Sequence, residues 1–433
     1  MFETLKNAFK VKEIRIKIFI TLALILVYRL GCYIPVPGIN ADAFGTSIEG
    51  NNFLGIMSAV TGGALSNGTL FAMGIGPYIN ASIIIQLLTV GIPALERMSK
   101  QGEEGRKKIA QITRYVTILL AVVQAFGILV NSAGSGGINF SLLGLSESWN
   151  FLTYIYMIII YASGTALTMW IGERITEYGV GNGISLLIFV GILSTAGMAI
   201  FAQITAIPND SMAIWGLLGF IVAAIVIFAC IVTVELAERK IPVQYAKQVK
   251  GRKMYGGQST HIPIRVNANG VLPLIFAFAI LSFPDLIMSM FWSGSSAQIW
   301  WNTYFGTSSW VYPIILSVFI IFFAFFYAQV QFNPEDISKN IQSYGGFIPG
   351  IRPGKPTTDY LKKVSNRITL FGALFLAIVA LVPSLIFKAI PGNITLLNAF
   401  SATGLLIVVS CALEFNQQLE SLIMMKHYKG FLK

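Results

Sequence analysis

The chain has 433 residues, of which 55% are hydrophobic and only 11% are charged. Soluble domains carry roughly 25% charged residues, so this composition excludes a protein whose whole surface faces water. The formal net charge of +11 fits nucleic acid, a membrane surface or an acidic protein as a partner, and the positions of the basic residues must decide among them.

Apolar runs follow one another along the whole chain. A run of about 20 apolar residues spans the hydrocarbon core of a bilayer, and none of these runs has the alternation of a barrel strand. We therefore expect an all-α polytopic membrane protein with ten transmembrane helices. The first is expected to be retained, because residues 1–17 are too polar and basic for a signal peptide. The predicted segments are 18–36, 70–92, 112–131, 151–171, 183–204, 213–235, 271–291, 311–330, 368–387 and 396–413.

Basic residues are unevenly distributed among the connections. The N-terminal arm, the connections after the second, fourth, sixth and eighth segments, and the C-terminal tail hold nearly all of them. The connections on the other side contain only Lys388, and Arg29 lies inside the first segment. Because cytoplasmic loops are enriched in Lys and Arg, this pattern predicts an even number of crossings with both termini cytoplasmic.

Three connections are not minimal loops. Residues 52–66 are apolar, Gly-rich and uncharged but shorter than a full span, which is typical of a re-entrant or interfacial segment. Residues 237–270 and 331–367 form long basic loops with many Gly, Pro and aromatic residues. Long loops tend to be functional or disordered, and this composition does not suit a solvated linker.

Side chains for metal, cofactor or catalytic chemistry are scarce. The histidines His261 and His427 lie in a loop and in the tail, and no phosphate-binding loop motif occurs. The cysteines Cys32, Cys230 and Cys411 lie in apolar stretches without a C-x-x-C pair, so we expect them to be packing residues. We therefore expect no metal site, no cofactor and no enzymatic activity.

Ionisable groups are also scarce inside the predicted segments, where ion-coupled transporters usually carry them. Arg29 is the one candidate, and we expect it to pack inside the bundle or to extend to the outer interface. The amides Gln86 and Gln124 suit either an ordinary interhelical hydrogen bond or a functional contact. A pathway through this bundle must be lined mainly by apolar side chains, which suits a bulky, variable substrate better than a small ion.

A series of short motifs occurs in order along the chain. They are IPVPGIN (34–40), GGALS (62–66), GIGPYINASIIIQLL (74–88), GEEGRKKI (102–109), TRY (113–115), GVGNGIS (179–185), GQSTHIPIRVN (257–267) and FIPGIRPGKPT (347–357). Together they resemble the SecY family, the central channel subunits of protein translocases, over essentially the whole chain. The resemblance implies two inverted halves of five helices, residues 1–205 and 206–433, that enclose an hourglass channel with a sideways opening into lipid.

The resemblance also implies a plug and a constriction. The plug is a short helix before the second segment, at about 53–66, and includes Phe53, Leu54, Ile56 and Met57. The constriction is a ring of aliphatic side chains, which offer no fixed hydrogen bonds and so seal against ions and water while tolerating any sequence. Their contacts with the substrate are weak and nondirectional. By motif position the ring consists of Ile75, Ile79, Ile184, Ile188, Ile275 and Ile407.

The same resemblance implies a lateral gate between segments 2–3 and 7–8, with Gln86 and Gln124 on the gate faces. Arg352 is the residue expected to dock the ribosome or the motor ATPase SecA, and Pro349, Pro353 and Pro356 limit the freedom of its loop. The basic residues of the preceding loop suit acidic protein or ribosomal RNA phosphate. They are Arg239, Lys240, Lys250 and Arg252.

Three functions remain to be compared. The first is a passive channel in the bacterial plasma membrane, which exports signal-bearing polypeptides and releases membrane segments into lipid. The resemblance gives this channel the subunits SecE and SecG, the motor SecA, the ribosome, precursor proteins and membrane lipids as partners. The second is a secondary transporter for a small solute, and the third is an intramembrane enzyme. The missing intramembrane carboxylates and catalytic motifs favour the channel.

Overall fold

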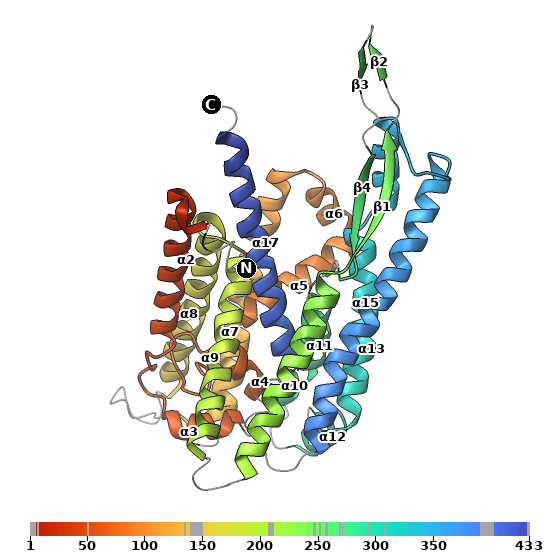
Figure 1. Ribbon diagram of the computed structural model, residues 1–433. Coiled ribbons are helices and arrows are strands. Elements are labelled where there is room, and N and C mark those ends of the chain that lie inside the picture. The colour runs from red at the N-terminus through yellow and green to blue at the C-terminus, as the bar shows by residue number, and fades with distance from the viewer. Residues whose placement is uncertain are drawn as a thin grey trace. The chain divides into compact units, whose positions relative to one another are not determined.

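The computed structural model divides into two compact units (Figure 1). The first unit comprises Met1–Gly219, Ala279–Tyr312 and Ile390–Lys433, and the second comprises Phe220–Phe278 and Pro313–Ala389. The residues that the structure describes are 6, 8–49, 52–133, 136–138, 150–206, 212–245, 248–250, 253–255, 259–267, 270, 272–291, 295–306, 309–389 and 402–430. The predicted division at residue 206 into two inverted halves stays a prediction.

Helices make up most of the described chain. In sequence order they are α2 (Lys12–Gly31), α3 (Ala41–Glu49), α4 (Asn52–Thr61), α5 (Gly76–Gly91), α6 (Pro93–Ser99), α7 (Glu103–Ala133), α8 (Asn150–Tyr178), α9 (Gly183–Ala206), α10 (Met212–Glu235), α11 (Leu272–Phe291), α12 (Ser296–Tyr304), α13 (Val311–Gln331), α14 (Pro334–Ser343), α15 (Lys355–Ala389) and α17 (Ala402–Gly430). Helices satisfy their own backbone polar groups, which is what a segment in lipid must do.

Each predicted segment overlaps one of these helices, from α2 for the first to α17 for the tenth. Among the described residues, five helices are long and apolar enough to cross a membrane, and the bent pair α5–α6, which turns by 105°, raises that number to six. The prediction of a helical membrane protein is therefore confirmed, whereas the number of ten crossings stays a prediction.

Helix boundaries differ from several of the predicted segments, and two of these differences have a clear physical reason. The second segment was expected from residue 70, but α5 begins at Gly76. The preceding residues form turns in which Gly62, Gly63, Gly68 and Gly74 have positive φ, a backbone conformation that glycine adopts without steric cost. In contrast, α15 begins at Lys355, well before the predicted residue 368, because polar residues continue a helix that hydropathy alone does not detect.

Two small sheets in the second unit correct the all-α prediction. Their strands are β1 (Glu238–Tyr245), β2 (Gln248–Lys250), β3 (Lys253–Tyr255), β4 (Ser259–Arg265) and β5 (Gly346–Phe347). The larger sheet has the order β4-β1-β5 with antiparallel pairs, and its register runs from Glu238 opposite Arg265 to Gln244 opposite Ser259. Strands β2 and β3 pair as a short ribbon beyond the β1–β4 pair (Figure 1).

The two long loops of the sequence therefore fold onto each other. Ile241 and Val243 of β1 and Ile264 of β4 are buried in one hydrophobic cluster. The other loop contributes Ile341 of α14 and Ile348, and the start of α15 contributes Leu361. Pro242 and Pro263 lie within the strands, and proline argues against a strand in sequence reasoning. This is why the period-two burial of β1 was not recognised.

Candidate functional site

Five of the six isoleucines predicted for the constriction meet in one hydrophobic cluster of the first unit. Ile75 and Ile188 are buried in it, at 5% and 6% exposure, and Ile79, Ile184 and Ile407 pack against it. These residues come from the start of α5, from α9 and from α17. The sixth, Ile275, is partly buried on α11 in the second unit, so its membership of a ring stays a prediction.

Local sequence fixes how these isoleucines are presented. Ile75 is the residue before α5, Pro77 lies in the first turn, and the Ile79 amide donates to the Ile75 carbonyl over 3.0 Å. Proline is well tolerated there because the first amides of a helix have no intrahelical acceptor. At the start of α9, the Asn182 side chain accepts a hydrogen bond from the Ile184 amide over 3.1 Å, which is a typical helix cap.

A polar hollow of about 930 Å³ lies next to this cluster in the first unit. It is lined from α2, α5, α7, α8, α9 and α17 by both charged and polar side chains, among them Lys17, Tyr78, Arg114, Glu173 and Glu414. Ile184 lines the hollow and also packs against the isoleucine cluster. Ile184 is therefore shared by the polar hollow and the isoleucine cluster.

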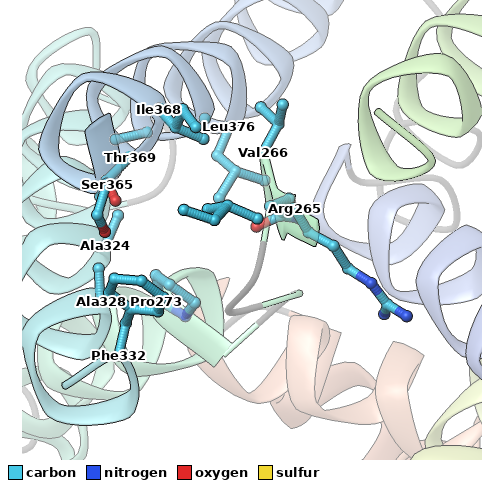
Figure 2. Close-up of a pocket in the computed structure, with 14 residues that line it drawn as sticks. Arg265, Val266, Pro273, Ala324, Ala328, Phe332, Ser365, Ile368, Thr369 and Leu376 are labelled. Atoms are coloured by element: carbon cyan, nitrogen blue, oxygen red, sulfur yellow. The ribbon is translucent and has the colours of Figure 1, made fainter. Parts of the chain in front are cut away.

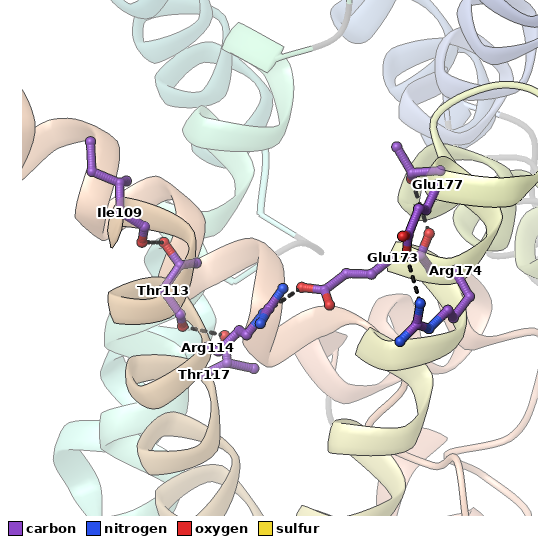
Figure 3. Close-up of polar contacts among 9 residues, drawn as sticks. Ile109, Thr113, Arg114, Thr117, Glu173, Arg174 and Glu177 are labelled. Carbon is purple, nitrogen blue, oxygen red and sulfur yellow. Dashed lines mark hydrogen bonds and ion pairs between the residues drawn. The ribbon is translucent and has the colours of Figure 1, made fainter. Parts of the chain in front are cut away.

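Ion pairs line the wall of the hollow. Arg114 on α7 donates through Nε to Glu173 on α8 over 2.7 Å, and Arg174 pairs with Glu177 over 2.7 Å (Figure 3). The Arg174 guanidinium also lies 5.5 Å from the ring centre of Trp170, within the range of a cation–π contact. The charges at this wall are therefore largely balanced.

Helix α4 lies where the plug was predicted. Its side chains Leu54 and Met57 are buried, at 3% and 8% exposure, in a cluster that includes residues of α3, α7 and α8. A Cβ added to Gly76 would collide with the Met57 methyl group, so Met57 touches the residue next to Ile75. The side chains of Phe53 and Ile56 lie outside the described residues.

Hydroxyl groups close the C-terminal end of α4. The Ser58 and Ser66 hydroxyls form a short hydrogen bond, the Gly63 amide donates to the Ser58 carbonyl over 2.9 Å, and Thr61 donates to the same carbonyl over 3.0 Å. Helix termini leave backbone groups without intrahelical partners, and these bonds satisfy part of that need.

The two predicted gate amides have different surroundings. Gln86 on α5 is exposed, whereas Gln124 on α7 is 3% exposed, and in the described part of the chain its Oε1 has no hydrogen-bond partner. Their role in a gate stays a prediction.

The predicted docking residues lie on the folded loops of the second unit. Arg352 is exposed in a loop held by its neighbours: Ser338 donates to the Gly354 carbonyl over 3.0 Å, and Thr357 donates to the Arg352 carbonyl over 2.9 Å. Arg239 and Lys240 are exposed on β1, and Lys240 pairs with Glu238 over 3.1 Å. Lys250 lies in β2, and Arg252 is outside the described residues.

A small cavity of about 140 Å³ lies at the base of this sheet (Figure 2). It is lined mainly by apolar side chains of α11, α13 and α15, with the Ser365 hydroxyl among them. A Cβ at Gly372 of α15 would lie 2.5 Å from the Val266 carbonyl oxygen, so glycine permits the close approach of α15 to the chain after β4. The cavity is an internal feature of the scaffold that carries Arg352.

Sequence reasoning missed the polar hollow and the bonds around α4. The motifs TRY (113–115) and GVGNGIS (179–185) contain Arg114, Asn182 and Ile184, so they pointed to this region without defining its shape. Glu173 lies on another helix, and only the fold brings it to Arg114.

Comparisons with known proteins agree with one another. The SecY family profile matches residues 69–416. The protein translocase subunit SecY of Streptomyces scabiei is 41% identical over 453 residues, and the alignment covers 100% of both chains. The protein of the same name from Thermotoga maritima is 41% identical over 446 residues, covering 100% of this chain and 98% of that one.

Solved structures share the fold. A structure described as that of a protein conducting channel matches with a TM-score of 0.67 at 22% identity, over 94% of this chain and 92% of the other. Sec61 in the canine ribosome-channel complex matches with a TM-score of 0.62 at 20% identity, over the same shares. With the family profile and the two full-length relatives, the conclusion is that this chain belongs to the SecY family.

Proposed function

We propose that this chain is the pore-forming subunit of a protein-conducting channel. It moves signal-bearing polypeptides across a membrane and releases membrane segments sideways into lipid. The observation that carries the proposal is a polar hollow whose lining includes Ile184, one of the isoleucines that meet in a single hydrophobic cluster. The others in that cluster are Ile75, Ile79, Ile188 and Ile407. Aliphatic side chains make no directional bonds, so they close around any passing sequence and exclude water when the pore is empty. The name of the full-length relatives, protein translocase subunit, supports the same function.

The proposed membrane arrangement has ten crossings in two inverted halves, residues 1–205 and 206–433, with both termini cytoplasmic in a bacterial plasma membrane. The one-sided distribution of Lys and Arg supports this orientation. Arg352, Arg239 and Lys240, which are exposed in the second unit, then face the cytoplasm. A solute transporter, the alternative from the sequence, has no support from the relatives, and we assign the chain no catalytic activity.

Helix α4 is the proposed plug of the resting channel, and Ile275 completes the constriction. The burial of Leu54 and Met57 supports a plug that is seated on the channel wall. The lateral gate is assigned to segments 2–3 and 7–8, with Gln86 and Gln124 on the side of the first unit.

The exposed basic sheet and loop of the second unit are the proposed docking surface for the motor SecA or the ribosome. A related fold, Sec61, is known from a ribosome-channel complex, and the yeast Ssh1 complex from a ribosome-bound state. Arg352 has the geometry such a role requires, since it is exposed on a loop that hydrogen bonds hold in place. SecE and SecG are the proposed small subunits of the complex.

Depletion of the chain tests the proposal directly. We expect signal-bearing precursors to accumulate in the cytoplasm when synthesis of the chain is stopped, and re-expression to restore their export. A cross-linker placed at Ile79 is expected to capture a stalled precursor, whereas the same probe at Ile118, an exposed position on α7, is expected to capture lipid only. Normal export after depletion would refute the channel function.

A further inference from the structure

Arg29 occupies an unusual position in the first unit. It lies in the last turn of α2, partly buried, and its Nη2 donates to the Val190 carbonyl of α9 over 2.6 Å, with a longer contact of 3.5 Å to the Gly191 carbonyl. A charged side chain inside a predicted membrane segment is unfavourable unless it finds polar partners. Backbone carbonyls of α9 supply those partners, so Arg29 ties α2 to α9.

The same guanidinium also lies against the end of α4. A Cβ added to Gly62 would collide with Nη1 of Arg29 and lie 2.6 Å from its Nη2. Gly62 directly follows Thr61, the last residue of α4, and has a φ of +73°. Because the carbonyl end of a helix carries partial negative charge, a cation at this place is favourable.

Helix α9 meets α4 at the same point. A Cβ added to Gly191 would collide with the carbonyl oxygen of Val60, so the last turn of α4 rests on the backbone of α9. Gly191 therefore has two roles: its carbonyl contacts Arg29, and its Cα lies against the last turn of α4. Three elements meet at Arg29: its own helix, α9 and the end of α4.

Helix α2 holds the other side of the connection between α4 and α5 as well. Tyr28 stacks on Phe71 with ring centres 5.6 Å apart, and Gly31 leaves room for the Phe71 ring. At Phe71 the connection is therefore held by packing against α2. At its other end, Gly62 and Gly63 both have positive φ. The Gly63 amide closes this turn onto the Ser58 carbonyl, and the Arg29 guanidinium packs against the turn at Gly62.

We propose that Arg29 is a positioning residue that latches the C-terminal end of α4 onto α9 and so keeps the resting channel sealed. The inference rests on the proposed role of α4 as the plug. Loss of the guanidinium removes the side-chain hydrogen bond to the Val190 carbonyl and the contact with the turn at Gly62. The end of α4 then departs from its seat more often, and ions pass.

The test is the resting ion conductance of the purified complex in planar bilayers. Arg29→Met, which keeps the length of the side chain and removes its donors, is expected to raise the conductance several-fold, toward that of a chain lacking residues 53–66. Arg29→Lys keeps the charge but lacks the planar fork of donors, so it is expected to lie between the wild type and Arg29→Met. Lys100→Met, which removes an exposed charge directly after α6, is the matched control and should leave the conductance unchanged.

A combined variant separates a latch from a general loss of packing. If Arg29 acts through α4, Arg29→Met adds no further conductance in the chain that lacks 53–66, because effects that share one element are not additive. An equal increase in both backgrounds would overturn the inference. A conductance that rises in the chain lacking 53–66 but not in Arg29→Met would overturn the latch, while the proposed role of α4 as the plug would stand. No rise in the chain lacking 53–66 would refute the plug itself.

A second variant keeps the test decisive if Arg29→Met does not assemble. Gly191→Ala places a methyl group against the Val60 carbonyl and displaces the end of α4 without changing any charge. It is expected to raise the resting conductance several-fold. A conductance equal to that of the wild type would refute the inference that the contact of α4 with α9 keeps the channel sealed. Gly197→Ala, on the same helix with open space around its Cα, is the control.

Discussion

The proposed seal of the first unit and the proposed docking surface of the second unit are built in opposite ways. The seal consists of buried aliphatic side chains and of close approaches at glycines, where Gly191 meets the Val60 carbonyl and Gly76 meets the Met57 side chain. The docking surface consists of exposed basic side chains on a small sheet with its own core. A seal must exclude water along its whole length, whereas a docking surface needs only a rigid base and charges that reach a partner. Changes in the two regions should therefore affect different measurements.

The largest effect is expected from Arg352→Glu. Charge reversal in the exposed, tied loop replaces attraction to an acidic or phosphate partner with repulsion, so we expect export to fall about tenfold or more. The resting ion conductance should not change, because the substitution is outside the proposed seal. Export of a precursor into vesicles and conductance in planar bilayers are the paired measurements. Lys363→Glu, on the exposed face of α15, is the matched charge-reversal control for the export measurement. Normal export by Arg352→Glu would remove the docking role.

The next effect is expected from Ile188→Asn, which tests the other side of the comparison. An amide in the buried isoleucine cluster attracts water, since a buried polar group without partners is unfavourable by about 1–3 kcal/mol. We expect the resting conductance to rise several-fold while binding of the motor or ribosome stays normal. Ile188→Leu keeps an apolar side chain of the same volume and should leave the conductance near that of the wild type. An unchanged conductance in Ile188→Asn would exclude this residue from the seal.

A smaller effect is expected from Leu361→Ala. Leu361 is fully buried in the cluster beneath the sheet, and removal of such a side chain typically lowers the free energy of unfolding by about 2–5 kcal/mol. We expect the loops 237–270 and 331–367 to become sensitive to limited proteolysis and export to fall partly, with the resting conductance unchanged. Leu370→Ala, an exposed position on the same helix, should change neither. Proteolysis at wild-type rates would show that this core does not hold the loops together.

The same two regions explain what the sequence predicts well and what it does not. Apolar runs and one-sided charge predict helices and their order, because lipid restricts a chain to few solutions. The isoleucines are found through motifs, and helical spacing places Ile75 near Ile79 and Ile184 near Ile188. The sheet was missed because Pro242 and Pro263 argue against strands and because β1 pairs with residues far along the chain, near Phe347. Contacts such as that of Arg29 with Val190 join residues 161 positions apart, and no local pattern reports them.

The smallest effect is expected from Arg114→Gln, at the wall of the polar hollow in the first unit. Its pair with Glu173 is short, at 2.7 Å, but the side chains are 46% and 29% exposed. Exposed ion pairs of this kind contribute about 0–1 kcal/mol, because water and salt screen the charges. We expect a fall in the melting temperature of a few degrees at most, and a smaller fall at high salt. Glu173→Gln should give the same shift, and the double variant no more than either one, since one interaction is lost in all three. A large, additive fall in the melting temperature would mean that each residue has a separate structural role. The wall of the hollow would then be tightly packed, as the proposed seal is, rather than solvated.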